Sequence, residues 1–311
     1  MTDLRASIDI GSNSILLLIG DFSNSIYKEI KNESNVTGLG RDLDKTGVFH
    51  TESMTNSFHV LSDYAAIAKS CGIDPGNIIT TATEASRVAK NAPEFFSRVL
   101  NETGIEVQTI TSAGEAYYST KGIMFNSQFD EDEICVMDIG GASTELIKLS
   151  TNENKIIQDF SMPIGAVRIT NWIEDNCYEK NLNKVLSDFK HDLKKIKTKK
   201  LYCVAGTMTS VGCMVLGLKS FEEMKIHGLN IETVKIFSMI NSYKAFTKTD
   251  FLKEFPFLGK RAITIYGGLL VATNIFKELE VELVEISTYG LRYGTLEQGR
   301  ILDEHLVKRK C

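Results

Sequence analysis

One nine-residue pattern, D-I-G-x-x-S-x-x-L, occurs twice in this chain, at residues 9–17 and at residues 138–146. Each copy follows an apolar stretch and runs into another, which predicts a strand, a tight turn and a second strand. An aspartate at a strand end, followed by small residues whose amide groups can turn outward, forms an anion-binding loop beside a metal-binding carboxylate. The duplication therefore predicts two such loops that face one site.

Strands and helices alternate through both halves of the chain. In the first half, apolar spacing predicts strands at 4–9, 15–22, 25–33, 77–81 and 105–110 and helices at 54–71, 93–103 and 112–125. The second half repeats the opening meander at 134–138, 144–149 and 156–162, and a long helix is expected at 261–277. This order predicts an α/β fold of two related halves.

The acidic stretch at residues 130–133 has the composition of a turn or linker, so we place the domain boundary there. The first domain is predicted to cover residues 1–128 and to be completed by a C-terminal helix over 296–311. The second domain is predicted to cover residues 129–295.

The composition excludes several classes of protein. A formal net charge of −5 argues against a general nucleic-acid binder, which usually carries a basic excess. No apolar run approaches the roughly 18 residues of a membrane helix, and no basic region followed by an apolar core opens the chain. The six cysteines form no C-x-x-C pair, and the five histidines lack the spacing of a zinc site. We therefore expect a cytoplasmic protein with no nucleic-acid or membrane partner, and whether it forms a homodimer stays open.

Six short blocks, spread from residue 9 to residue 294, carry a resemblance to a known family. They are Asp9 to Ser14, Ala82 to Arg87 with Asn91, Glu115-Ala116, Asp138 to Glu145, Pro163 to Arg168 and Gly290 to Gly294. In this order they resemble the exopolyphosphatase and guanosine pentaphosphate phosphatase family, within the class of actin, the sugar kinases and the heat-shock ATPases. The resemblance implies two actin-like, ribonuclease H-like domains with a phosphate-binding cleft between them.

The same resemblance implies an activity. Members of that family are Mg²⁺-dependent hydrolases, with Mn²⁺ as an alternative ion, that act on a terminal phosphoanhydride. We therefore expect release of orthophosphate from inorganic polyphosphate, or conversion of guanosine pentaphosphate to tetraphosphate. The sequence does not decide between these two substrates.

Phosphoryl transfer needs amide groups that bind phosphate, a metal ion and an oriented water, and the two loops suit the first two needs. We expect phosphate to be bound by Gly11, Ser12, Asn13 and Ser14 in the first loop, and by Gly140, Gly141, Ala142, Ser143 and Thr144 in the second. Asp138 and Glu145 are expected on neighbouring strand ends, where they would bind the metal together with Asp9. The alternative is ordinary hairpin turns with turn and edge carboxylates.

Glu115 matches the position at which the family carries its general base, so the resemblance implies that it takes a proton from the attacking water. The alternative comes from the local sequence. Ser112-Ala113-Gly114-Glu115 also has the form of a capping box, in which Ser112 caps the helix and Glu115 bonds back to the Ser112 amide.

Two further positions match phosphate-binding positions of the family. The resemblance implies that Arg87 binds phosphate oxygens through its planar guanidinium, and a surface arginine on a first helical turn is the alternative. Gly206 and Thr207, between a strand and a helix, match a segment that binds a nucleotide or further phosphates. A plain strand-to-helix turn is the alternative there.

Two residues depart from the family pattern. Ala142 stands where the second loop usually has glycine, and alanine would cost about 1 kcal/mol if the backbone there were left-handed. Gly114 replaces an acidic residue that often precedes the catalytic glutamate. These departures leave open a non-catalytic sensor of polyphosphate or guanosine alarmones, and the fold class leaves open an actin-class kinase or ATPase.

Overall fold

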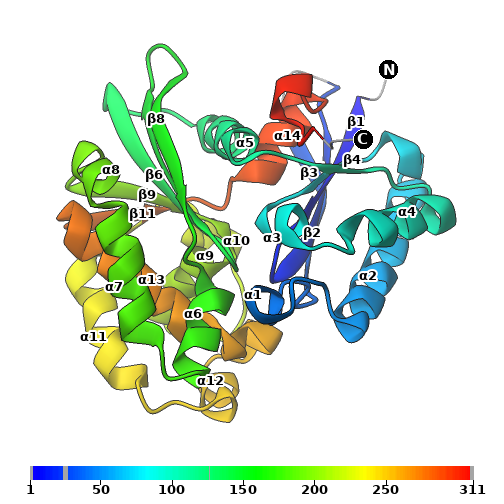
Figure 1. Ribbon diagram of the computed structural model, residues 1–311. Coiled ribbons are helices and arrows are strands. Elements are labelled where there is room, and N and C mark those ends of the chain that lie inside the picture. The colour runs from blue at the N-terminus through cyan, green and yellow to red at the C-terminus, as the bar shows by residue number, and fades with distance from the viewer. Residues whose placement is uncertain (1–2, 24–26, 126, 309–311) are drawn as a thin grey trace. The chain divides into compact units, whose positions relative to one another are not determined.

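The computed structural model describes residues 3–23, 27–125 and 127–308. The chain divides into two compact units, one formed by residues 1–125 and 291–311 and the other by residues 126–290. Each unit is built on its own sheet, blue to cyan in the first unit and mainly green in the second (Figure 1). The predicted α/β class is confirmed.

The sheet of the first unit has the strand order β3-β2-β1-β4-β5 among the described residues. The strands are β1 (Leu4–Ile10), β2 (Ser14–Asp21), β3 (Lys28–Val36), β4 (Ile79–Ala82) and β5 (Val107–Thr109). β1 lies in the middle, antiparallel to β2 and parallel to β4, and its Ile8 and Ile10 are fully buried. The predicted third strand begins at residue 25, in a stretch (24–26) outside the described residues.

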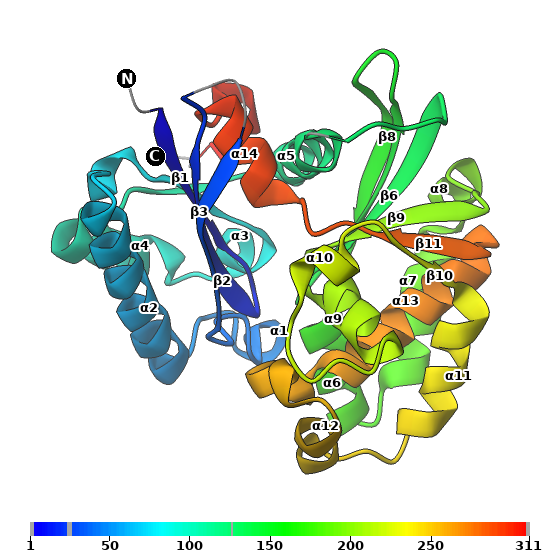
Figure 2. The ribbon, with the colours of Figure 1, turned by 180° about the vertical axis from the view of Figure 1, so that it is seen from behind.

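Helices cover both faces of this sheet. α2 and α4 lie on one face, and α5 and α14 lie on the other (Figures 1 and 2). The helices of the first unit are α1 (Leu43–Thr46), α2 (Thr51–Ser70), α3 (Glu84–Val88), α4 (Ala92–Thr103), α5 (Ser112–Met124) and α14 (Leu291–Gln298), with 3-10 turns η1 (Pro75–Asn77) and η3 (Asp303–His305). α2 ends at Ser70, and Gly72, just after the C-cap residue Cys71, takes a left-handed conformation (φ 83°).

The sheet of the second unit has the order β10-β11-β9-β6-β7-β8 among the described residues. The strands are β6 (Glu133–Ile139), β7 (Thr144–Ser150), β8 (Lys155–Met162), β9 (Lys200–Val204), β10 (Leu229–Glu232) and β11 (Leu283–Ile286). β6 is antiparallel to β7 and parallel to β9, as β1 is to β2 and β4. Val136, Met137 and Leu146 are fully buried in this sheet.

The helices α9 and α13 pack directly on the second sheet, and α6 and α11 pack against α13 (Figure 1). The helices of this unit are α6 (Ala166–Glu174), α7 (Tyr178–Asp188), α8 (Lys190–Lys195), α9 (Ala205–Val215), α10 (Glu223–Ile226), α11 (Thr233–Tyr243), α12 (Lys248–Glu254) and α13 (Ile265–Leu279), with a 3-10 segment η2 (Pro256–Ile263). In the described part of the chain, no helix has both the length and the apolar composition that a membrane span requires.

The two sheets share one topology. The orders β3-β2-β1-β4-β5 and β8-β7-β6-β9-β11 match strand for strand, and β10 extends the second sheet at its edge. The two motif copies form equivalent hairpins, β1–β2 and β6–β7. The duplication predicted from the sequence is therefore present in the fold.

In this topology the candidate site residues lie near the carboxyl ends of parallel strands. β1 is parallel to β4, and β6 is parallel to β9. Each motif loop therefore lies at the same sheet edge as the segment that follows the parallel neighbour, which leads to Arg87 in the first unit and to Gly206 in the second. Ligands of α/β sheets bind preferentially at such edges.

The predicted C-terminal helix over 296–311 is wrong. The helix is α14, which begins at Leu291 and ends at Gln298, and Gly299 terminates it in the left-handed conformation (φ 76°). The Arg5 guanidinium binds the carbonyl groups of Leu296 and Glu297 at this helix end. Residues 303–305 form only a 3-10 turn, and residues 309–311 lie outside the described part of the chain.

Candidate active site

The two motif loops are closed by the same hydrogen bond. In the first loop the Gly11 amide donates to the Ser14 carbonyl, and in the second the Gly140 amide donates to the Ser143 carbonyl, both at 3.0 Å. Both glycines lie in half-exposed turns between antiparallel strands. The sequence repeat is thus a repeat of local geometry.

The carbonyl groups of the first loop are bound by the segment that follows β3. The amides of residues 37 and 38 both donate to the Asn13 carbonyl at 3.0 Å, and the Gly40 amide donates to the Ser12 carbonyl at 2.7 Å. A methyl group on Gly40 would lie 2.8 Å from the Ser12 Cβ, so only glycine permits this close approach.

The carbonyl groups of the second loop are bound by the start of α6. The amide of Ala166 donates to the Gly140 carbonyl at 2.9 Å, and the amides of residues 167 and 168 donate to the Gly141 carbonyl at 2.8 and 3.1 Å. The Arg168 guanidinium donates to the Ala142 carbonyl at 2.6 Å. The helix N-terminus therefore fixes the orientation of three successive peptide groups.

The carbonyl groups of both loops are bound, whereas several of their amide groups are not. Among the described residues, the amides of Ser12 and Asn13, and those of residues 141–143, donate to no acceptor. Ser12, Ala142 and Ser143 are nevertheless buried, and a buried amide without an acceptor is costly. Adjacent N–H groups without an acceptor are what an anion-binding loop requires, and phosphate binding by these two loops stays a prediction.

The second loop tolerates alanine at the position where the family usually has glycine. Ala142 is buried, and its backbone is not among the positive-φ positions of the described chain. The cost considered for a left-handed alanine does not arise. The close contact is instead at Gly165, where a methyl group would lie 2.5 Å from the Gly141 carbonyl and 2.7 Å from the Ala142 amide nitrogen.

Two carboxylates lie side by side at the carboxyl end of the second sheet. Asp138 on β6 is the register partner of Glu145 on β7, so the two side chains share one sheet face, as the sequence predicts. Ser161 on β8 is the next residue in this row and donates its hydroxyl to Glu145 Oε1 at 2.7 Å. Glu145 is only 2% exposed, which excludes the alternative of a solvent-exposed edge residue.

The first loop has one carboxylate where the second has two. Asp9 on β1 corresponds to Asp138, but its register partner on β2 is Leu16, at the position that corresponds to Glu145. Asp9 is half-buried. The duplicated loops are therefore not chemically equal, and the pair of carboxylates belongs to the second unit.

The carboxylate pair suits a hard cation that keeps other ligands. Mg²⁺ prefers oxygen ligands and usually takes one or two carboxylates while water and substrate phosphates complete its coordination. Among the described residues no group of three or more histidine, cysteine, aspartate or glutamate side chains could hold a metal alone. Asp138 and Glu145 therefore fit Mg²⁺ in ligand type and number, and they do not fit a zinc site.

Glu115, Arg87 and Glu84 form a cluster in the first unit. Arg87 Nη1 donates to Glu115 Oε2 at 2.9 Å and to the Ile110 carbonyl at 3.0 Å. Arg87 Nη2 lies 3.6 Å from Glu84 Oε2. The three side chains are only 10–17% exposed, so Arg87 is not the surface arginine of the alternative interpretation.

The capping-box interpretation of Glu115 is wrong. The N-cap of α5 is Thr111, whose hydroxyl accepts from the Gly114 amide at 3.0 Å, so Glu115 lies one position too late to close the box. The Glu115 carboxylate bonds to Arg87 instead. Gly114 admits no side chain, because a methyl group there would lie 2.8 Å from the Cβ of His305.

Gly206 and Thr207 lie in the first turn of α9, directly after β9, as predicted. The Arg261 guanidinium lies directly against Gly206, in the space that a methyl group would need, and donates to Ser210 Oγ at 3.3 Å. Burial lowers the pKa of Arg261 from its high usual value. Ala205 is left-handed (φ 65°), and such strained backbone is concentrated at functional sites.

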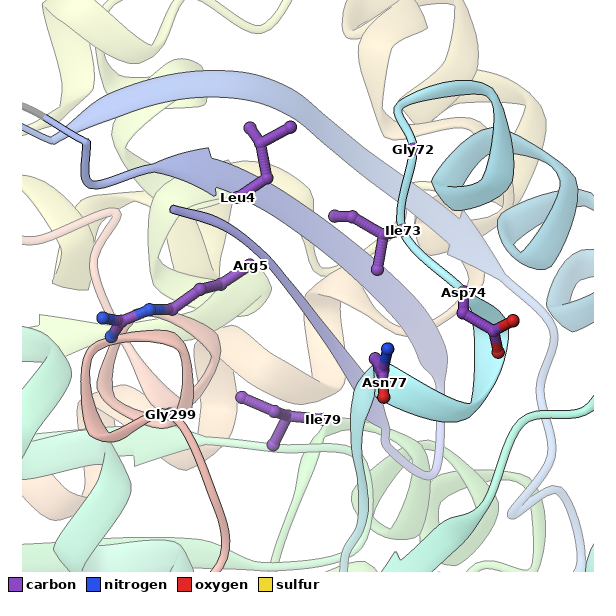
Figure 3. A pocket seen from close by; sticks show the side chains of 8 residues that line it. All are labelled: Leu4, Arg5, Gly72, Ile73, Asp74, Asn77, Ile79 and Gly299. Carbon is purple, nitrogen blue, oxygen red and sulfur yellow. The ribbon is translucent and has the colours of Figure 1, made fainter. Parts of the chain in front are cut away.

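A cavity of about 310 Å³ opens at the opposite end of the first sheet. Its lining includes Leu4 and Arg5 at the start of β1, whereas Asp9 lies near the end of that strand. Figure 3 shows Arg5 and Asp74 at opposite sides of it, pointing away from one another. Arg5 is already paired with Asp3 at 2.7 Å. This cavity lacks convergent polar groups and is separate from the site residues.

The comparison with protein families decides the relationship. The sequence pattern of the Ppx/GppA phosphatase family matches residues 21–299. The chain belongs to the Ppx/GppA phosphatase family. The resemblance predicted from the six sequence blocks is therefore confirmed.

Individual relatives of this Ppx/GppA chain cover nearly all of it. It is 31% identical to the bifunctional 3-dehydroquinate synthase/phosphatase of Fusobacterium nucleatum, over 95% of this chain but only 46% of that protein's length. It is 24% identical to exopolyphosphatase 2 of Mycobacterium tuberculosis, over 96% of both chains. The crystal structure of the Aquifex aeolicus Ppx/GppA family member superposes with a TM-score of 0.76 at 27% identity, covering 96% of this chain and 97% of that one. The two-domain actin-like fold follows from these matches.

Three residues beside the candidate site residues of this Ppx/GppA chain were not identified from the sequence. Glu84 lies beside Arg87, Ser161 binds Glu145, and Arg261 lies against Gly206. None belongs to the duplicated motif. Only Glu84 lies in one of the six blocks, and its spacing of three from Arg87 on a helix was the one available signal.

Proposed function

We propose that this protein is a Mg²⁺-dependent phosphoanhydride hydrolase that releases orthophosphate from the end of inorganic polyphosphate, or from guanosine pentaphosphate to give the tetraphosphate. The observation that carries the proposal is the paired loop geometry. Both loops have their carbonyl groups bound and adjacent amides without an acceptor in the described chain. Two amide nests on one chain suit a substrate with several phosphate groups.

The comparisons support this class of substrate. The Mycobacterium tuberculosis relative of matching length is named an exopolyphosphatase, and the family is named for phosphatase activity. Both candidate substrates present the same terminal phosphoanhydride to the loops. The residues described here therefore support the reaction without choosing between the two substrates.

In the proposed site the two loops bind the phosphate groups through the amides of residues 11–14 and 140–144. Gly206, Thr207 and the adjacent Arg261 bind further phosphates at the start of α9, where the helix N-terminus favours an anion. Asp138 and Glu145, together with Asp9, hold Mg²⁺ or Mn²⁺. When bound, the ion neutralises charge on the phosphate oxygens.

Glu115 acts as the general base in this proposal. Its carboxylate takes a proton from a water molecule as the water oxygen attacks the terminal phosphorus, and the phosphoanhydride bond breaks on the opposite side. Arg87 holds the carboxylate through Nη1, which fixes its direction. Nη2 of the same guanidinium is buried and makes no hydrogen bond with the described residues, so it is the atom that would bind a phosphate oxygen.

A phosphate-release assay tests the proposal. Purified protein with Mg²⁺ is expected to release orthophosphate from polyphosphate, from guanosine pentaphosphate or from both. Glu115→Gln should lower kcat at least about 100-fold, because a positioned base contributes that much. Glu106→Gln, an exposed glutamate of the same unit, is the matched control and should retain activity. The proposal fails if neither substrate yields phosphate, or if Glu115→Gln is as active as the control.

A further inference from the structure

The first motif loop begins with a peptide group that is bound at both ends. The Ile10 carbonyl accepts from the Thr83 amide at 3.2 Å. The Gly11 amide, on the other side of the same peptide bond, donates to the Ser14 carbonyl at 3.0 Å. Because the carbonyl and the amide of one peptide bond share a rigid plane, these two hydrogen bonds fix its orientation directly after Asp9.

The equivalent peptide of the second loop, between Ile139 and Gly140, is bound by a different donor. Its amide donates to the Ser143 carbonyl at 3.0 Å, as in the first loop. The Ile139 carbonyl, however, accepts from the side-chain hydroxyl of Thr207 at 3.1 Å. Any residue except proline supplies a backbone amide, whereas this hydroxyl requires a particular side chain. The orientation of the second loop therefore depends on the residue type at position 207.

Both branches of the Thr207 side chain are packed. Thr207 lies in the first turn of α9 and is only 7% exposed. A methyl group on Gly268 of α13 would lie 2.4 Å from the Thr207 Cγ2, so glycine permits the close contact between these two helices, which pack together in this unit (Figure 1). Because a β-branched side chain is stiff at χ1, the contact of the methyl branch also sets the direction of the hydroxyl. The hydroxyl proton is directed at the Ile139 carbonyl.

The peptide held by Thr207 joins the two parts of the second loop that the proposed function uses. Asp138, assigned to the metal, precedes this peptide, and the amides of residues 141–143, assigned to phosphate, follow it. Rotation of the peptide plane would displace both groups. Hydrogen bonds that orient a metal site from outside typically change the metal affinity 10- to 100-fold when they are removed, by about that order.

We propose that Thr207 is a positioning residue whose hydroxyl orients the second loop and the Asp138 carboxylate through the peptide between Ile139 and Gly140. The inference deepens the proposed function and rests on it for the roles of Asp138 and of the loop amides. The hydroxyl acts through the loop and not on the substrate. The two units thus hold equivalent peptides with different donors, and a side-chain substitution can remove only the second donor.

Two variants remove the hydroxyl. Thr207→Val keeps the branched shape, and Thr207→Ala adds no methyl group against the Ile139 carbonyl. Thr207→Ser keeps the hydroxyl and is the rescue variant. Thr273→Val is the matched control, because Thr273 is also buried in this unit but donates its hydroxyl to the Leu269 carbonyl of its own helix, α13, at 2.8 Å.

The first measurement is amide hydrogen exchange by mass spectrometry, which does not depend on activity. Peptides over residues 139–146 should exchange about fivefold faster in both hydroxyl-free variants than in the wild type, since one hydrogen bond contributes on that order. Peptides over residues 10–17, which form the equivalent first loop, should keep the wild-type rate and are the internal reference. Thr207→Ser and Thr273→Val should match the wild type over both segments.

The second measurement is the Kd of Mn²⁺ by calorimetry, together with kcat/KM for phosphate release. Both hydroxyl-free variants should raise the Kd of Mn²⁺ about tenfold, and Thr207→Ser should restore it to within about twofold of the wild type. The kcat/KM of both hydroxyl-free variants should fall at least about tenfold, because a displaced positioning group is costly. Thr273→Val should retain the wild-type values of both quantities.

The inference is overturned if residues 139–146 exchange at the wild-type rate in both hydroxyl-free variants. It is also overturned if residues 10–17 exchange faster to the same extent, or if neither variant folds, because Thr207 would then support the fold and not the loop. An unchanged Kd of Mn²⁺ would contradict the link to Asp138. If the wild type releases no phosphate, the proposed function fails separately, and hydrogen exchange still decides whether Thr207 holds the loop.

Discussion

Several glycines near the candidate site are constrained because a neighbouring group occupies the space that a side chain would need. Gly165 touches the Gly141 carbonyl, Gly114 touches His305, and Gly206 touches Arg261. In each case the missing side chain lets another group pack against a segment that carries candidate site residues. The residues of the duplicated motif were predictable because their spacing is local. Contacts such as Arg87 to Glu115, which join residues 28 positions apart, come from the fold and not from local spacing.

Gly165→Ala tests whether the second loop depends on this packing. The added methyl group would lie 2.5 Å from Gly141 backbone atoms, so the loop or the start of α6 must shift. We expect kcat/KM for phosphate release to fall at least about tenfold, since small displacements of positioning groups are costly. The free energy of unfolding should fall by about 1–3 kcal/mol.

Gly76→Ala is the control for that experiment. A methyl group on Gly76 would have its nearest neighbour at 3.4 Å, an ordinary contact. Both variants are measured by enzyme kinetics and by urea denaturation. Equal kinetics for the two variants would contradict the role assigned to Gly165.

His305 gives a prediction for the pH dependence of stability. Burial lowers its pKa below the ordinary 6.5, although Glu304 acts in the opposite direction. The unfolded chain therefore binds the proton more readily, so stability is greatest above pH 6.5 and declines as the pH falls from 6.5 toward the lower pKa of the folded state. Burial also lowers the pKa of His227, which acts in the same direction.

The measurement is Tm at pH 7.5 and at pH 5.5. The Tm of the wild type should be lower at pH 5.5 than at pH 7.5, and the Tm of His305→Gln should fall by less. His59→Gln, at an exposed position, is the control and should follow the wild type. A wild-type Tm that rises on acidification over this range would contradict the assignment.

At the scale of elements, strand register explains why two distant carboxylates meet. Asp138, Glu145 and Ser161 occupy one row across β6, β7 and β8. The hairpin prediction was sufficient for the first pair because one tight turn fixes their register. The position of Ser161 beside Glu145 depends on the pairing of β7 with β8. This pairing includes a register shift between Lys148 and Leu149, which no local sequence pattern predicts.

Other elements were harder to predict for identifiable reasons. The long helix expected at 261–277 begins only at Ile265, because the residues before it form a 3-10 segment (Pro256–Ile263) that is kinked at Gly259 (φ 51°). The helices α10, α11 and α12 were not predicted. They are 4 to 11 residues long, and helices this short depend on tertiary packing more than on their own sequence.

Ser161→Ala tests the row of side chains. Removal of the hydroxyl leaves Glu145 Oε1 without the 2.7 Å bond that orients it, so the carboxylate should bind the metal less well. We expect the Mg²⁺ concentration for half-maximal activity to rise about tenfold, with kcat at saturating Mg²⁺ changed much less. Ser238→Ala, at an exposed serine of α11, is the control. An unchanged Mg²⁺ requirement in Ser161→Ala would show that Ser161 does not orient a metal ligand.

In the whole molecule, one strand topology occurs twice, and the two units carry different candidate site residues. The first unit carries Glu115 and Arg87, and the second carries the carboxylate pair Asp138 and Glu145. The sequence repeat predicted the duplication because both hairpins keep the same spacing. It also contains the asymmetry, because Leu16 and Glu145 stand at corresponding positions of the two copies, and the structure places them at corresponding register positions.

In the proposed function, Glu115 of the first unit and Asp138 of the second act in the same reaction. The most direct test measures kcat/KM for phosphate release in Glu115→Gln, in Asp138→Asn and in the double variant. When two groups act together in one reaction, the effects of removing each on kcat/KM are strongly non-additive. We therefore predict that each single variant lowers kcat/KM at least about 100-fold, and that kcat/KM of the double variant is close to that of the less active single variant. An Asp138→Asn variant with wild-type activity, or losses that multiply in full in the double variant, would contradict the account.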